Sequence, residues 1–95
     1  MKIRYSPESV DDLDRVVEFV EVKNPFAARR IAIDLQEGTD KLKQFPKIGL
    51  PVLKASDPEL IRDLYISSYT VRYLIADEII YILRIWHNKE NEKNL

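Results

Sequence analysis

The chain has 95 residues, of which 45% are hydrophobic and 33% charged, and this composition is typical of a single globular domain. It contains no cysteine, which excludes disulfides, thiolate chemistry and zinc sites built on cysteine pairs. The net charge of −1 argues against a protein that binds nucleic acid through a large basic surface, although a local basic patch stays open.

The first half of the chain predicts a short β-prone strand at residues 1–5, followed by two helices. Ser6 and Asn24 are each followed by proline, and a capping side chain before a proline marks a helix start. Because the turn between the helices is short, we expect an antiparallel hairpin. Gly38 is expected to weaken the second helix by about 1 kcal/mol relative to alanine. The apolar stripes expected in the core are Val10, Leu13, Val17 and Val20, widened by Val16 and Phe19, and then Ala28, Ile31, Leu35 and Leu42.

The second half predicts a loop and then three consecutive strands. Residues 46–59 contain several prolines and form the loop, with a brief extended piece at Val52-Leu53. From Leu60 the apolar period becomes two, and tight turns at Ser67-Ser68 and Asp77-Glu78 separate the strands. The last strand is apolar on both faces, which is typical of a central strand, so we expect it to pair with the first strand as well. The three strands are Ile61–Ile66, Tyr69–Ala76 and Ile79–His87.

These elements indicate an α+β fold with the order β-α-α-β-β-β, in which an N-terminal helical hairpin packs on a small antiparallel sheet. One domain is expected to cover residues 1–95, ending in a polar, solvated tail. The N-terminus has no signal-peptide core, and the longest apolar run, Ile79–Leu83, is too short to span a bilayer. We therefore expect a cytoplasmic protein that does not contact membranes.

Five short motifs follow one another along nearly the whole chain. They are Asn24-Pro25-x-Ala27-Ala28, Leu42-x-x-Phe45-Pro46-x-x-Gly49, Ile61-Arg62-Asp63-Leu64, Tyr69-x-Val71-x-Tyr73 and Ile82-Leu83-Arg84-Ile85-Trp86-His87. In this order and spacing they resemble the RelE/ParE superfamily of toxins from type II toxin–antitoxin systems. The first and last motifs resemble the ParE branch in particular, and the superfamily's fold agrees with the element order inferred above.

The resemblance implies one of two activities, both neutralised by a small antitoxin encoded beside the toxin. ParE-like members poison DNA gyrase by binding it, without established catalytic residues of their own, whereas RelE-like members cut mRNA within the ribosome. We expect a gyrase inhibitor whose partners are DNA gyrase and an antitoxin. Two alternatives remain: a ribosome-dependent mRNA endonuclease, and an inactive member that only binds antitoxin and regulates their operon.

At most positions where RelE-like nucleases carry catalytic side chains, this chain has other residues. The resemblance places a catalytic sheet arginine at Ile66, and a C-terminal arginine and tyrosine at Asn88 and Asn94. A second nuclease subtype ends its last strand in His-Tyr, and its histidine aligns with His87 although Asn88 follows. The sheet arginine of that subtype falls at Tyr69. One catalytic group remains rather than a set, so we expect no catalytic site.

His87 is the only histidine, and imidazole is the side chain best suited to proton transfer near neutral pH. If the chain were a nuclease, His87 would act with Arg62 and Arg72, because guanidinium groups match phosphate oxygens. Otherwise His87 is a strand-end residue with local hydrogen bonds. Arg62, Arg72 and Arg84 form a phosphate patch only if they share a face, which strand register decides. The alternative is salt bridges with Asp63, Asp77 or acids of the antitoxin.

The partner-binding surface is expected on the last three strands and the tail. Trp86 is a candidate anchor, since tryptophan is common among interface hot spots, and equally a candidate core residue. Strict alternation places Arg84 and Trp86 on the same face as Ile82. The antitoxin is expected in grooves beside the helical hairpin and along the sheet edge at Ile61–Ile66. The residues assigned to partner binding are Arg62, Arg72, Arg84, Trp86, His87 and Lys89.

Asp11, Asp12 and Asp14 cluster near the start of the first helix and resemble a metal site only by composition. Acids are favoured there by the helix dipole, and this explains the cluster better. We expect no metal, no cofactor and no small-molecule substrate.

Overall fold

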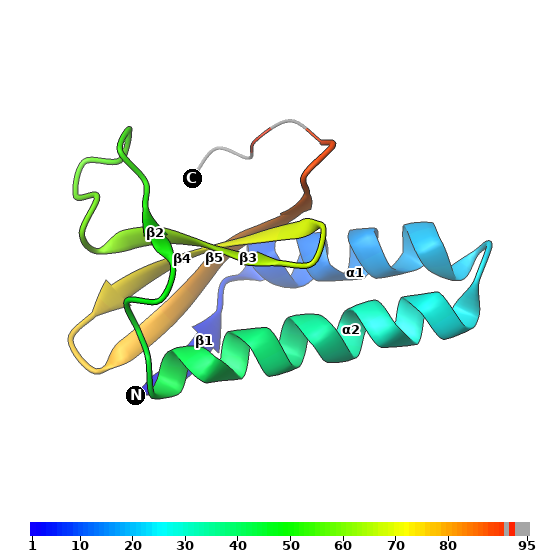
Figure 1. Ribbon diagram of the computed structural model, residues 1–95, viewed down its shortest axis with the longest axis horizontal. Helices are drawn as coiled ribbons and strands as arrows, with labels where there is room; N and C mark the ends of the chain where they lie inside the picture. The colour runs from blue at the N-terminus through cyan, green and yellow to red at the C-terminus, as the bar shows by residue number, and fades with distance from the viewer. Residues whose placement is uncertain (91, 93–95) are drawn as a thin grey trace.

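In the computed structural model, which describes residues 1–90 and 92, two helices lie side by side as an antiparallel hairpin along one side of a twisted sheet (Figure 1). The turn between the helices and the loop at residues 52–60 lie at opposite ends of the molecule (Figure 1). The elements are β1 (Lys2–Tyr5), α1 (Pro7–Glu21), α2 (Pro25–Asp40), the 3-10 turn η1 (Lys41–Lys43), β2 (Leu50–Pro51), β3 (Ile61–Ile66), β4 (Tyr69–Ala76) and β5 (Ile79–His87).

The sheet has five strands in the order β1-β5-β4-β3-β2. The α+β class, the element order and the pairing of the last strand with the first are confirmed. Two details differ from expectation. The sheet is mixed, because β1 runs parallel to β5, and the extended piece of the loop is Leu50–Pro51 rather than Val52-Leu53. Because Leu50–Pro51 pairs with Arg62 and Asp63, it covers part of the β3 edge that we expected to be open.

Both helix starts form as the sequence predicts. The Ser6 hydroxyl accepts a hydrogen bond from the Ser9 amide at 3.0 Å, and the Asn24 side chain accepts one from the Ala27 amide at 3.1 Å. Ser6 also donates its amide to the Ile82 carbonyl and its hydroxyl to the Leu83 carbonyl, both at 2.9 Å. The start of α1 is therefore fastened directly to β5.

The core lies between the hairpin and the sheet, and it confirms most of the predicted apolar stripes. The prediction for α1 is wrong at its ends, because Val10 is 44% exposed and Phe19 is 76% exposed. The side of α1 that meets the sheet instead includes the buried polar residues Ser9 and Asp12. The predicted apolar stripe is therefore rotated about the helix axis relative to the face that is buried. The buried core residues are Val16, Leu35, Leu42, Tyr69, Val71, Tyr73, Ile80, Ile82 and Ile85.

Gly38 has a packing role that its low helix propensity hides. A Cβ at this position would lie 2.5 Å from Cδ1 and 2.8 Å from Cγ1 of Ile66 on β3. The glycine therefore lets α2 approach the end of β3 closely, at the expense of local helix stability.

A bulge in β5 corrects the face assignment made from alternation. Arg72 pairs with Arg84 while the next residue, Tyr73, pairs with Ile82, so Leu83 is an extra residue in β5. Beyond the bulge the alternation is inverted: Ile82 and Ile85 both join the core, and Trp86 points to the opposite face. The expectation that Arg84 and Trp86 share a face with Ile82 is therefore wrong.

Within residues 1–90 and 92, no helix is long and apolar enough to cross a membrane.

Candidate functional site

Arg72 lies on the sheet face that points away from the helices, since its neighbours Val71 and Tyr73 are in the core. Its guanidinium donates to both carboxylate oxygens of Asp63, with Nε–Oδ1 at 2.8 Å and Nη2–Oδ2 at 2.9 Å. It also lies over the Trp86 ring, 5.1 Å from the centroid. The bidentate pair raises the pKa of Arg72 above its ordinary value, against the opposing effect of burial. Trp86 itself is buried.

Arg84 stands opposite Arg72 in the strand register but binds a carboxylate of α1. Asp12 accepts hydrogen bonds from Arg84 Nε at 2.7 Å, from the Ile85 amide at 2.9 Å and from Arg15 Nη1 at 2.8 Å. Burial would raise the pKa of Asp12, but these hydrogen bonds outweigh it and hold that pKa below its ordinary value. Asp12 therefore pairs a strand amide of β5 and ties α1 to the sheet, which explains one acid of the cluster at the start of the helix.

Arg62 lies on the other face from Arg72 and organises the loop at residues 46–59. Its guanidinium donates to the Gly49 carbonyl at 2.9 Å and the Glu59 carbonyl at 2.8 Å, and it forms a salt bridge with the Glu59 carboxylate. The Tyr73 hydroxyl accepts from the Gly49 amide at 3.0 Å and donates to the Pro46 carbonyl at 2.7 Å. Arg62 is thus the centre of a hydrogen-bond network beneath the loop, and only 6% of it is exposed.

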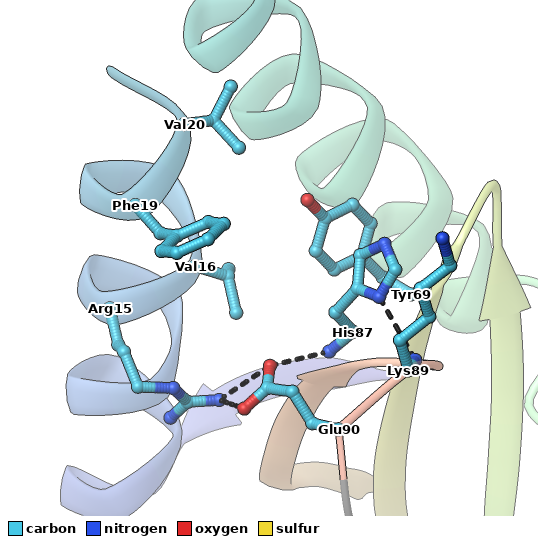
Figure 2. A pocket seen from close by; sticks show the side chains of 8 residues that line it. All are labelled: Arg15, Val16, Phe19, Val20, Tyr69, His87, Lys89 and Glu90. Atoms are coloured by element: carbon cyan, nitrogen blue, oxygen red, sulfur yellow. Dashed lines mark hydrogen bonds and ion pairs between the residues drawn. The ribbon is translucent and has the colours of Figure 1, made fainter. Parts of the chain in front are cut away.

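A groove of about 570 Å³ opens between α1 and the ends of β4 and β5. Figure 2 shows Val16, Phe19 and Val20 of α1 on one side, facing Tyr69 and His87 on the other. The His87 ring meets the Tyr69 ring edge to face, with centroids 5.0 Å apart. Arg15, Lys89 and Glu90 complete the lining. The groove is therefore mainly apolar, with charged groups at its rim.

The chain after β5 folds back toward α1 at the foot of this groove. The Glu90 carboxylate accepts from the His87 amide at 2.9 Å and forms a salt bridge with Arg15 at 3.1 Å (Figure 2). The His87 Nδ1 accepts from the Lys89 amide at 3.0 Å, which fixes the ring orientation. The first residues of the tail are therefore tied to the fold rather than solvated, whereas residues 91 and 93–95, including Asn94, lie outside the described part of the chain.

The residues singled out from the sequence are thus divided among four places. Arg72 and Trp86 lie on the open sheet face, Arg62 lies under the loop, Arg84 joins β5 to α1, and His87 and Lys89 line the groove. Of the alternatives left open, the three arginines form salt bridges rather than a shared phosphate patch, and Asp63 is one of their partners. In the described part of the chain, no three His, Cys, Asp or Glu side chains gather as a metal site would require.

The sequence analysis did not identify three residues that form ion pairs around these sites. They are Asp12, Arg15 and Glu90. Arg15 is three residues after Asp12, a spacing at which side chains meet on a helix, and this signal could have found the first pair. No sequence signal indicates that Glu90 reaches Arg15, because the contact joins residues far apart in the chain.

The comparisons with known proteins agree with this architecture. A family model described as the ParE toxin of the type II toxin–antitoxin system parDE matches residues 3–92. Toxin RelE2 of Caulobacter vibrioides is 32% identical over 76 residues, covering 80% of this chain and 82% of that protein. Toxin RelE1 of the same organism is 28% identical over 79 residues, covering 83% and 84%.

A solved structure, the chromosomal ParDE TA system from P. aeruginosa, has the same fold. The match has a TM-score of 0.75 at 22% sequence identity and covers 92% of this chain and 95% of that one. The family match, the relatives and the shared fold converge on one conclusion: this chain belongs to the ParE toxin family of type II toxin–antitoxin systems, within the RelE/ParE superfamily.

Proposed function

We propose that this ParE-family toxin inhibits DNA gyrase by binding it, without chemistry of its own, and that a cognate antitoxin neutralises it in the cytoplasm. Membership of the ParE family supports gyrase as the target, since the superfamily resemblance assigns gyrase to this branch. The proposal therefore treats the chain as a stoichiometric inhibitor rather than a nuclease.

One observation carries the choice against RNA cleavage. Metal-free cleavage needs a base, an acid and cations around a single phosphate. Arg62 and Arg72 point to opposite faces of the sheet, so they do not converge. The strand partners of Arg62 and His87 are four residues apart on β4, roughly 13 Å at the usual strand rise. The three groups named for a nuclease therefore do not surround one phosphate.

We assign gyrase binding to the groove and its rim. Phe19 is 76% exposed on the α1 side of the groove, and the lining also includes the cations Arg15 and Lys89. An exposed aromatic ring above an apolar groove is the composition of an interface hot spot, because a partner can bury it completely. The placement extends our assignment of His87 and Lys89 to partner binding, and it leaves Arg62 and Arg84 with structural tasks.

The first test is plasmid supercoiling by purified gyrase. Inhibition is expected to track the toxin-to-gyrase ratio rather than the incubation time, with accumulation of cleaved plasmid, and addition of antitoxin should restore supercoiling. Full supercoiling at a large molar excess of folded toxin would refute the gyrase proposal.

The variant Phe19→Ser tests the groove in the same assay. Loss of a hot-spot ring is expected to raise the half-inhibitory concentration at least about fivefold, equivalent to about 1 kcal/mol. Leu53→Ser is the matched control, because Leu53 is 85% exposed but belongs to the loop at the other end of the molecule (Figure 1). Equal potency of the two variants would place the gyrase contact elsewhere.

A ribosome-dependent mRNA endonuclease is the second candidate, favoured by two observations. The relatives from Caulobacter vibrioides are named RelE toxins, and the groove brings His87 beside Tyr69 with Lys89 at the rim. If this candidate holds, primer extension on translated mRNA will show codon-phased cuts that His87→Gln reduces by about 100-fold or more, since a general acid or base contributes about 10²–10⁴-fold. If expression of the toxin alone does not slow growth, the remaining alternative of an inactive, antitoxin-binding member gains support.

A further inference from the structure

A carboxylate from the end of the chain sits on the buried arginine of the open sheet face. The Arg72 Nη2 donates to Oε1 of Glu92 at 2.6 Å, in addition to its bidentate pair with Asp63. The Arg72 side chain is 6% exposed and the Asp63 side chain 11%, whereas the Glu92 side chain is 54% exposed. Arg72 and Asp63 are thus fixed parts of the sheet, and Glu92 approaches them from outside.

The surroundings of Arg72 have the features of a prebuilt carboxylate site. Asp63 fixes the plane of the guanidinium through its hydrogen bonds, and the guanidinium stacks over the Trp86 ring. The hydrogen bond from Arg72, with its positive charge and that of Lys54, lowers the pKa of Glu92. The geometry therefore presents an oriented N–H donor to an incoming anion.

We propose that Arg72 is a binding site for an acidic side chain of the antitoxin, and that Glu92 occupies this site in the free toxin until the antitoxin displaces it. The inference rests on the antitoxin half of the proposed function and is independent of the gyrase target. Glu92 stands in for the antitoxin carboxylate, because it is the same chemical group bound in the same way.

The site favours a carboxylate over a nucleic-acid phosphate. Asp63 already neutralises the charge of Arg72, so the site offers one further cation, Lys54, and the whole chain carries a net charge of −1. Phosphate backbones are bound by clusters of uncompensated cations. Arg72 and Arg84, which stand opposite each other in the strand register, are instead each paired with a carboxylate. Glu92 is more than half exposed, so its ion pair is weak and exchanges readily with a competitor.

The test is calorimetric titration of full-length toxin with the cognate antitoxin. Glu92→Gln removes the internal competitor, so the antitoxin is expected to bind about three- to tenfold more tightly. The reason is that the apparent affinity rises as the fraction of toxin with an open site increases. Glu90→Gln is the matched control: it breaks the tie between the tail and Arg15 but leaves the acid at Arg72 in place. If Glu90→Gln tightens binding as much as Glu92→Gln, or if neither changes it, the proposal is wrong.

Acid-to-amide variants of the antitoxin identify the group that replaces Glu92. One such variant should cancel the gain in affinity produced by Glu92→Gln. Arg72→Lys in the toxin should weaken antitoxin binding, and combining it with that antitoxin variant should cause no further loss of affinity. Absence of any antitoxin acid coupled to Arg72 would overturn the proposal. So would a Glu92→Gln toxin that gains affinity for a 20-mer RNA rather than for antitoxin. Glu92→Gln toxin should inhibit gyrase like wild type, so failure of the gyrase proposal is read separately.

Discussion

Replacing Asp12 with alanine is expected to lower the free energy of unfolding by about 3 kcal/mol, the lower end of the range for breaking a buried ion pair. Asp12 is 2% exposed and accepts hydrogen bonds from Arg84, Arg15 and the Ile85 amide. The substitution leaves a strand amide and a partly buried guanidinium without that acceptor. Urea denaturation followed by circular dichroism measures the change.

Asp11 provides the matched control, because it is the preceding residue on the same helix and is exposed. Asp11→Ala is expected to change the free energy of unfolding by no more than about 0.5 kcal/mol. Equal effects of the two substitutions would mean that helix-start acidity matters and the contact with β5 does not.

The same carboxylate predicts a pH dependence. The pKa of Asp12 is lower in the folded chain than its ordinary value of 3.8. The stability it contributes is therefore fully present above pH 3.8 and is lost as the pH falls through the lowered pKa of the folded state. Wild type should lose more stability than Asp12→Ala between pH 5 and pH 2, and parallel pH profiles of the two proteins would contradict the assignment.

Gly49→Ala is expected to destabilise the toxin by about 2–3 kcal/mol, the upper range for forcing extra volume into a packed site. An added Cβ would lie 2.7 Å from the Tyr73 hydroxyl and 2.9 Å from the Asp63 carbonyl. The carbonyl belongs to the sheet backbone and cannot move aside, and the hydroxyl already binds the Gly49 amide. Denaturation gives the loss of stability, and faster proteolysis within residues 46–59 would report the loosened loop.

Gly38→Ala is the control for this prediction. Its Cβ would meet the Ile66 side chain, whose end can rotate, and alanine improves helix propensity by about 1 kcal/mol. The two effects oppose each other, so we expect a net change within about 1 kcal/mol. A larger loss at Gly38 than at Gly49 would show that the approach of α2 to β3 is the tighter contact.

Buried charged residues hold the parts of this toxin together. Arg62 fixes the loop, and Arg84 joins β5 to α1. Substituting either arginine would disturb folding, so any effect on partner binding would be indirect. Exposed groove residues such as Phe19 are therefore better probes of the target than the arginines that a motif comparison selects first.

Local chemistry along the chain determined the elements of this fold. The Ser6-Pro7 and Asn24-Pro25 pairs start both helices, and the period of two after Leu60 gives the three long strands in their observed positions. The motif order was sufficient to predict the superfamily. These features are readable because capping, alternation and turn chemistry depend on residues a few positions apart.

Only the tertiary structure decided which side chains meet. The extra residue Leu83 inverts the face of Trp86, and a register shift of this kind has no local sequence signal. The pairing of Asp12 with Arg84, and of Glu92 with Arg72, joins residues 72 and 20 positions apart in the chain. Such contacts depend on how layers pack, so the sequence by itself determined the family and the elements, while three-dimensional packing placed the arginines in structural ion pairs and left the groove exposed.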